Sequence, residues 1–173
     1  TLSLHDALPI LVEWVKFGKP SALGIVTGMV AGLGTITPAS GFVGPAGALV
    51  IGISAGVICF YATMTIKQVL RIDDSLDVFP VHGVGGILGT MMAGIFASDQ
   101  LGLFSGQGLA DGVSIGSQLG VQLTGVLATG LYTAIATFVI LKVVGVITTL
   151  RADGDEETEG LDIRMHNERG YDL

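Results

Sequence analysis

A single histidine in an uncharged stretch is the first candidate for chemistry in this 173-residue sequence. His82 is the only ionisable residue between Asp77 and Asp99. An ionisable side chain at membrane depth is a candidate functional group. A neutral imidazole donates a hydrogen bond from one ring nitrogen and accepts one at the other, so His82 could pass protons or bind a small polar solute. A structural histidine bonded to a backbone carbonyl is the alternative.

Three carboxylates lie just before this stretch. Asp73, Asp74 and Asp77 have the spacing Asp-Asp-x-x-Asp, which in prenyl-transferring enzymes holds Mg²⁺ and diphosphate through hard oxygen ligands. Carboxylates at a helix start also accept hydrogen bonds from free backbone N–H groups. We predict capping by Asp74 and Asp77, without metal or cofactor, because no second acidic motif follows. A Mg²⁺-dependent prenyl-transferring enzyme remains the less favoured alternative.

The composition identifies the lipid bilayer as the surrounding solvent. Only 13% of residues are charged and the mean hydropathy is +0.72, whereas about a quarter of a soluble domain is charged. The net charge of −7, with no basic cluster, argues against nucleic-acid binding. The single cysteine, Cys59, can form neither a disulfide framework nor a cysteine metal site.

Uncharged stretches divide the chain into predicted transmembrane helices. Pro20 to Ile66 is long enough for two spans of about 20 residues, and the prolines and glycines between Thr37 and Gly47 favour a turn. Val78 to Ser98 fits one span and Gly112 to Leu141 another. We predict an all-α membrane protein, a polytopic transmembrane helix bundle, with helices at about 21–37, 46–70, 78–98 and 114–150.

Glycine is abundant, at 27 of 173 residues, and recurs every fourth residue in the predicted helices. Gly24 and Gly28 form one such pair, and Gly85 and Gly89 another. Small residues four apart let two helix backbones approach closely. Tight packing is one interpretation, and a backbone that lines a narrow pore is the other.

The basic residues indicate how the helices are oriented. All eight flank the same ends of the predicted helices or lie in the tail, and basic residues collect on the cytoplasmic side. This distribution predicts a cytoplasmic carboxy-terminal tail. The basic residues are Lys16, Lys19, Lys67, Arg71, Lys142, Arg151, Arg164 and Arg169.

The two ends of the chain differ from the middle. Residues 1–10 do not form a signal peptide, and we interpret them as a foreign leader. Residues 11–20 resemble the cytoplasmic end of a preceding, truncated transmembrane helix. Residues 151–173 form an acidic tail of the kind that is usually solvated and mobile. Its last part mixes apolar, acidic and aromatic groups, as a docking segment does.

Several short motifs are distributed along the chain. They are Gly18-Lys19-Pro20-Ser21, Thr37-Pro38-Ala39, the run from Arg71 to Gly83, Gly160-Leu161-Asp162, and His166 to Tyr171. Together they closely resemble the ammonium transporter family, the Amt, Mep and Rhesus proteins, over Leu11 to Leu173. The resemblance implies the carboxy-terminal part of a bacterial-type transporter, holding the end of the seventh helix and the eighth to eleventh helices of an eleven-helix inverted-repeat fold.

The resemblance implies ammonium or ammonia transport across the cell membrane, not an enzyme activity. His82 matches the second of the family's paired pore histidines, Val78 a residue near the cytoplasmic exit, and Asp77 a conserved aspartate. The family's other pore residues belong to helices absent from this chain, so we predict that the chain alone is inactive. A membrane ammonium sensor is the alternative function.

The resemblance also implies partners. Family members form homotrimers with one pore per subunit. The tail with Asp162, His166 and Tyr171 resembles the family's regulatory terminus, which packs on the neighbouring subunit and adjoins the surface bound by PII signalling proteins.

Overall fold

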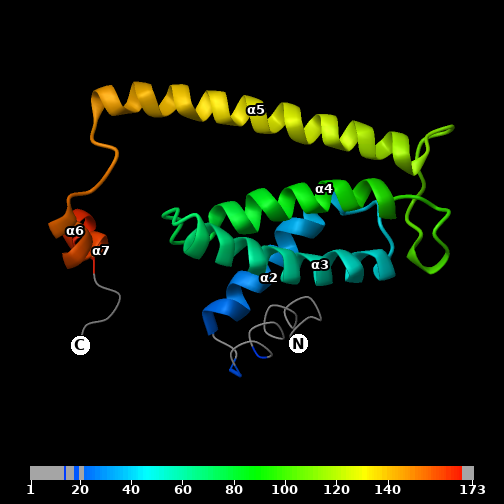
Figure 1. The fold of residues 1–173 in the computed structure, drawn as a ribbon, viewed down its shortest axis with the longest axis horizontal. Coiled ribbons are helices and arrows are strands. Elements are labelled where there is room, and N and C mark those ends of the chain that lie inside the picture. Colours follow the sequence, from blue (N-terminus) through cyan, green and yellow to red (C-terminus); the bar gives the residue numbers. More distant parts are fainter. Residues whose placement is uncertain (1–13, 15–17, 20–21, 169–173) are drawn as a thin grey trace. The chain divides into compact units, whose positions relative to one another are not determined.

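The computed structural model describes Trp14, residues 18–19 and residues 22–168, and this part of the chain consists of helices and loops without a β-strand (Figure 1). The predicted all-α fold class is confirmed. The predicted foreign leader at 1–10, and most of the predicted helix end at 11–20, lie outside the described residues. The described residues up to Leu127 form one compact unit and those from Ala128 onward form another.

The first described helix, α2 (Ala22–Ile36), ends at a proline-containing turn. It has no charged residue, as expected of a helix in lipid. The chain then tightens into the 3₁₀ turn η1 (Thr37–Ala39), with a proline near its start. The hydroxyl of Thr37 donates to the carbonyl of Leu33 at 2.7 Å, which satisfies one of the carbonyls left open at the helix end.

The second helix, α3 (Pro45–Met64), begins at its proline. The missing N–H of proline costs nothing in the first turn, and its fixed φ suits a helix. The amide of Ala48 donates to the carbonyl of Gly44 at 2.9 Å and closes this turn. At its other end α3 continues as a π-helical segment, η2 (Thr65–Val69).

The third helix changes type along its length. Its first part, η3 (Phe79–Val84), is π-helical, and its second part, α4 (Gly85–Phe96), is α-helical. Pro80 lies near the start of η3, and because proline has no backbone N–H it cannot donate the hydrogen bond that an α-helix makes to the carbonyl four residues earlier. The sequence predicted one helix over 78–98. In the structure, His82 lies in the π-helical first part of this helix. π-helical turns are frequent at functional sites.

Glycines allow α2, α3 and α4 to pack tightly in the first unit. In Figure 1, α3 and α4 lie side by side, and α2 packs against both. A Cβ added at Gly89 would overlap the carbonyl oxygen of Thr35, which is fully buried. One added at Gly85 would lie 2.8 Å from the Thr35 hydroxyl and 3.4 Å from the sulfur of Cys59. These contacts favour the tight-packing interpretation of the Gly85 and Gly89 pair.

The loop after α4 is fastened to the turn before α3. The amide of Gln107 donates to the carbonyl of Phe42 at 2.9 Å, and the amide of Gly106 donates to Ser98 at 2.8 Å. The short 3₁₀ turn η4 (Gly102–Phe104) lies within this loop. These backbone bonds fix the loop and the ends of both helices as one structure.

The long helix α5 (Ile115–Ile147) follows. Its 33 residues span about 50 Å at ~1.5 Å per residue, more than the ~30 Å hydrocarbon core. Within the described residues, three helices are long and apolar enough to cross a membrane, and a shorter apolar helix covers Gly24–Ala39. The three are Pro45–Val69, Phe79–Phe96 and Ile115–Ile147.

The acidic tail forms two short helices, α6 (Gly154–Glu159) and α7 (Leu161–His166), where the sequence predicted a solvated, mobile run. Asp153 and Glu156 form a reciprocal capping box at the start of α6, which satisfies two free N–H groups. Two exposed ion pairs also form in the described part of the tail. Arg151 Nε lies 3.1 Å from Glu157 Oε1, and Arg164 Nη1 lies 3.7 Å from Glu159 Oε2. Local capping and pairing therefore order residues whose composition favours disorder.

Candidate functional site

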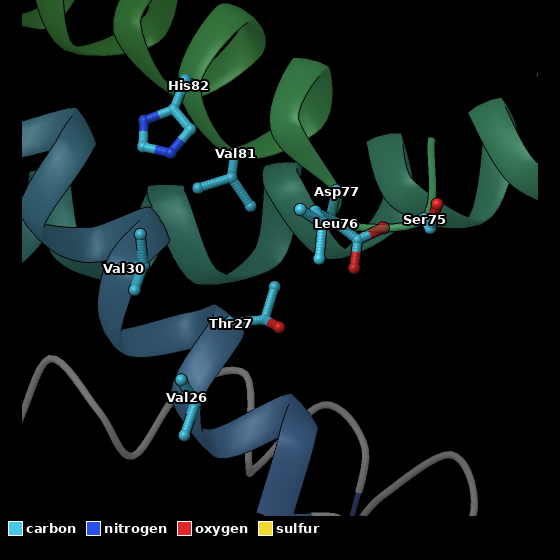
Figure 2. Close-up of a pocket in the computed structure, with 8 residues that line it drawn as sticks. All are labelled: Val26, Thr27, Val30, Ser75, Leu76, Asp77, Val81 and His82. Carbon is cyan, nitrogen blue, oxygen red and sulfur yellow. The ribbon is translucent and has the colours of Figure 1, made fainter. Parts of the chain in front are cut away.

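A cavity of about 210 Å³ lies between α2, the loop before η3, and η3 (Figure 2). The His82 ring and the Asp77 carboxylate lie on opposite sides of Val81 in this view (Figure 2). The hydroxyl of Thr27 adds a further polar group from α2. The full lining is Val26, Thr27, Val30, Ser75, Leu76, Asp77, Val81 and His82.

Helical spacing explains why α2 supplies its three lining residues. Val26 and Val30 are four residues apart and therefore share one face of the helix, with Thr27 beside them. Gly34 continues this face toward His82, because a Cβ added there would lie 3.8 Å from the imidazole Nδ1. The His82 side chain is exposed within this chain. The site thus combines apolar side chains from α2 and η3 with the imidazole of His82, which can both donate and accept a hydrogen bond.

Asp74 caps the start of the third helix. Its two carboxylate oxygens accept hydrogen bonds from the amides of Val78 and Phe79, both at 2.9 Å. These amides lack partners earlier in the helix, so the carboxylate replaces the missing carbonyls. The positive end of the helix dipole adds to this stabilisation. Capping positions η3, and with it the His82 side chain.

Asp77 has a different role from the capping predicted for it. Its Oδ1 lies 2.7 Å from Lys67 Nζ, and the residue is 8% exposed. Asp77 also has a φ of +57°, a left-handed conformation that the chain uses to turn into η3. Its amide donates to the carbonyl of Asp74 at 3.3 Å. The prediction is therefore corrected for Asp77, because Asp74 caps the helix while Asp77 pairs with a lysine.

We expect Asp74→Ala to lower the free energy of unfolding by about 0.5–2 kcal/mol, because two helix-start amides lose their acceptor. Asp74→Asn keeps one carbonyl oxygen and should lose less. Thermal unfolding in detergent, followed by circular dichroism, measures both changes. Equal losses in the two variants would contradict the capping role.

The Mg²⁺ alternative finds no support in the placement of the three aspartates. The Asp74 carboxylate accepts hydrogen bonds from the amides at the helix start, and the Asp77 carboxylate forms an ion pair with Lys67. In the described part of the chain, no three His, Cys, Asp or Glu side chains gather closely enough to hold a metal ion. Two of the three aspartates in this motif thus make their contacts at the turn into η3.

Apart from Asp74 at the helix start, the predicted site residues divide into three groups. His82 and Asp77 line the same cavity. Val78 is 52% exposed and is absent from the cavity lining. Asp162 and His166 lie in α7 of the other unit, and Tyr171 lies outside the described residues.

Sequence reasoning missed Thr27, Val30 and Lys67. The first two follow a helical spacing that ends at the cavity, so their shared face could have indicated them. Lys67 lies six residues before the acidic motif, and Arg71 is closer to that motif in sequence. Its partner could not be read from the sequence, because ten residues and a loop separate Lys67 from Asp77.

Comparisons with known proteins agree on one family. A model described as Ammonium Transporter Family matches residues 7–171. An ammonium transporter of Bacillus subtilis (strain 168) is 42% identical over 162 residues, which make up 94% of this chain and 40% of that protein. The chain thus spans about 40% of the length of the first curated relatives it matches.

Solved structures give the same result for the fold. A structure named Sensor Amt Protein has a TM-score of 0.81 and 28% identity, covering 94% of this chain and 38% of its own. The Mep2 crystal structure from Candida albicans has a TM-score of 0.73 and 34% identity, covering 90% and 35%. With its long apolar helices, the chain is a multi-pass membrane protein, and it belongs to the ammonium transporter family.

Proposed function

We propose that this chain forms part of a transporter for ammonium or ammonia, with His82 beside the conducting route. The observation that carries the proposal is the His82 imidazole beside the apolar side chains of Val26, Val30 and Val81, in an uncharged helix. An ionisable group at membrane depth is costly, and such groups typically mark functional sites. Membership in a family whose relatives are named ammonium transporters supports the choice of substrate.

The proposed mechanism follows from the cost of desolvation. Moving a bare cation through an apolar route is far more costly than moving a neutral solute that finds hydrogen-bond partners. In the intact protein, NH₄⁺ would lose a proton at the outer side and NH₃ would pass the imidazole. His82 can donate to or accept from NH₃, depending on which nitrogen carries its proton.

We also propose that other segments of the intact transporter cover the exposed His82 side chain. Inverted-repeat transporters place their site between two halves, and this chain spans about 40% of its relatives' length. Val78 would lie near the cytoplasmic exit. The tail would be cytoplasmic, in a homotrimer, with Asp162, His166 and Tyr171 regulatory and a PII signalling protein as a possible partner.

The 173-residue chain alone is expected to give no saturable ammonium flux, because His82 would face lipid instead of the second wall of a route. The measurement is the ammonium-dependent pH change inside liposomes that contain the purified chain, compared with protein-free liposomes. The intact transporter is the positive control. Saturable flux from the chain alone, lost in His82→Ala, would show that the further segments are dispensable.

A further inference from the structure

An ion pair between Lys67 and Asp77 lies beside the His82 cavity, which is lined by Asp77. Lys67 Nζ lies 2.7 Å from Asp77 Oδ1 and donates a hydrogen bond to the carbonyl of Ser75 at 3.4 Å. Ser75 and Asp77 both line the cavity. The primary ammonium of this lysine thus lies between one carboxylate oxygen and one carbonyl oxygen at the edge of the cavity.

Backbone contacts hold this arrangement in place. Lys67 lies in η2, and the amide of Ile72 donates back to the carbonyl of Ile66 at 3.0 Å, so the loop leaves η2 in a fixed direction. Asp74 fastens the other end of the loop by capping η3. Asp77 Oδ1 is buried and accepts no hydrogen bond of good geometry from the described residues. Lys67 therefore contacts this oxygen as an ion pair and balances its charge.

A lysine head group has the same chemistry as a small alkylammonium ion, with three N–H donors on one positive charge. The Asp77 carboxylate and the Ser75 carbonyl oxygen can therefore bind either a lysine head group or a small alkylammonium ion. We propose that Lys67 is a tethered cation that occupies an ammonium-type site formed by Asp77 and Ser75, and so keeps that site closed to free ammonium. The choice of ammonium as the excluded ion rests on the proposed function.

This occupancy has a consequence for transport. A buried carboxylate without a counter-ion attracts cations strongly, because screening by water is weak there. Such a site at the edge of the cavity would retain an ammonium ion and slow its release. With Lys67 in place, the Asp77 charge is balanced within the chain, and the cavity holds no open carboxylate.

The test measures binding of radiolabelled methylammonium to the intact protein by equilibrium dialysis in detergent. Lys67→Met removes the cation and keeps an apolar side chain of similar length, so it should gain one saturable methylammonium site, at least about tenfold tighter than any in the parent protein. Lys67→Arg keeps the charge and should gain none. Adding Asp77→Asn to Lys67→Met should abolish the gain.

A second measurement keeps the proposal testable where Lys67→Met is unstable. Methylammonium should raise the melting temperature of Lys67→Ala, since a ligand of the folded state stabilises it, and sodium at equal ionic strength should not. No methylammonium effect in either measurement, or a gain that survives Asp77→Asn, would overturn the proposal. Because neither readout requires flux, absent transport would contradict the proposed function without deciding this one.

Discussion

His82→Ala in the intact transporter is expected to lower the rate of ammonium flux by about tenfold. The substitution removes one hydrogen-bond partner from the cavity wall, and ~1.4 kcal/mol of lost stabilisation at the barrier corresponds to that factor. Assembly should be retained, because alanine keeps the Cβ and removes only the ring that lines the cavity. The measurement is the initial rate of the ammonium-dependent pH change in liposomes.

Tyr132→Phe is the matched control for this experiment. Tyr132 is 74% exposed on α5, so its hydroxyl can be removed without changing the cavity. Its flux should equal that of the parent protein. An unchanged rate in His82→Ala would leave the imidazole with a structural role only, which is the interpretation the sequence left open.

Gly89→Val is expected to destabilise the packed helices by about 1–3 kcal/mol or more, the usual cost of overpacking. The new Cβ would overlap the carbonyl oxygen of Thr35, a backbone atom that cannot rotate away. To relieve the overlap, α4 would have to move away from α2, and the cavity wall would move with it. The melting temperature in detergent and the elution volume on size exclusion both report this change.

Gly86→Ala is the control on the same helix, three residues earlier. An added Cβ at Gly86 meets no atom within 4 Å, and alanine has the higher helix propensity. Stability should therefore be unchanged or slightly higher. Similar losses in Gly86→Ala and Gly89→Val would contradict the contact with Thr35 as the cause of the destabilisation.

The all-α class could be predicted because its causes are local. Charge-free stretches of sufficient length indicated helices, and the turn between Thr37 and Gly47 contains prolines that the helix ladder does not accept. The π-helical turns could not be predicted in this way. An uncharged stretch has the same composition whether its turns are α or π, and the difference depends on how Pro80 and its neighbours pack.

The candidate site was predicted in part for the same reason. His82 stood out because it is a lone ionisable group, and its place in the cavity follows from the helix that carries it. The roles of Asp74 and Asp77 depend on the path of the loop. Asp77 turns the chain with a positive φ, whereas the Asp74 carboxylate accepts hydrogen bonds from two amides further along the chain. Spacing alone did not separate them.

The π-helical turn at Phe79–Val84 also bears on how this helix can change during evolution. Inserting one residue into an α-helix rotates everything beyond it by about 100°, at 3.6 residues per turn. A π turn absorbs such an insertion locally. Selection can therefore adjust the part that carries His82 while the Gly85 and Gly89 face keeps its register on Thr35, so that conduction and packing can diverge separately within one helix.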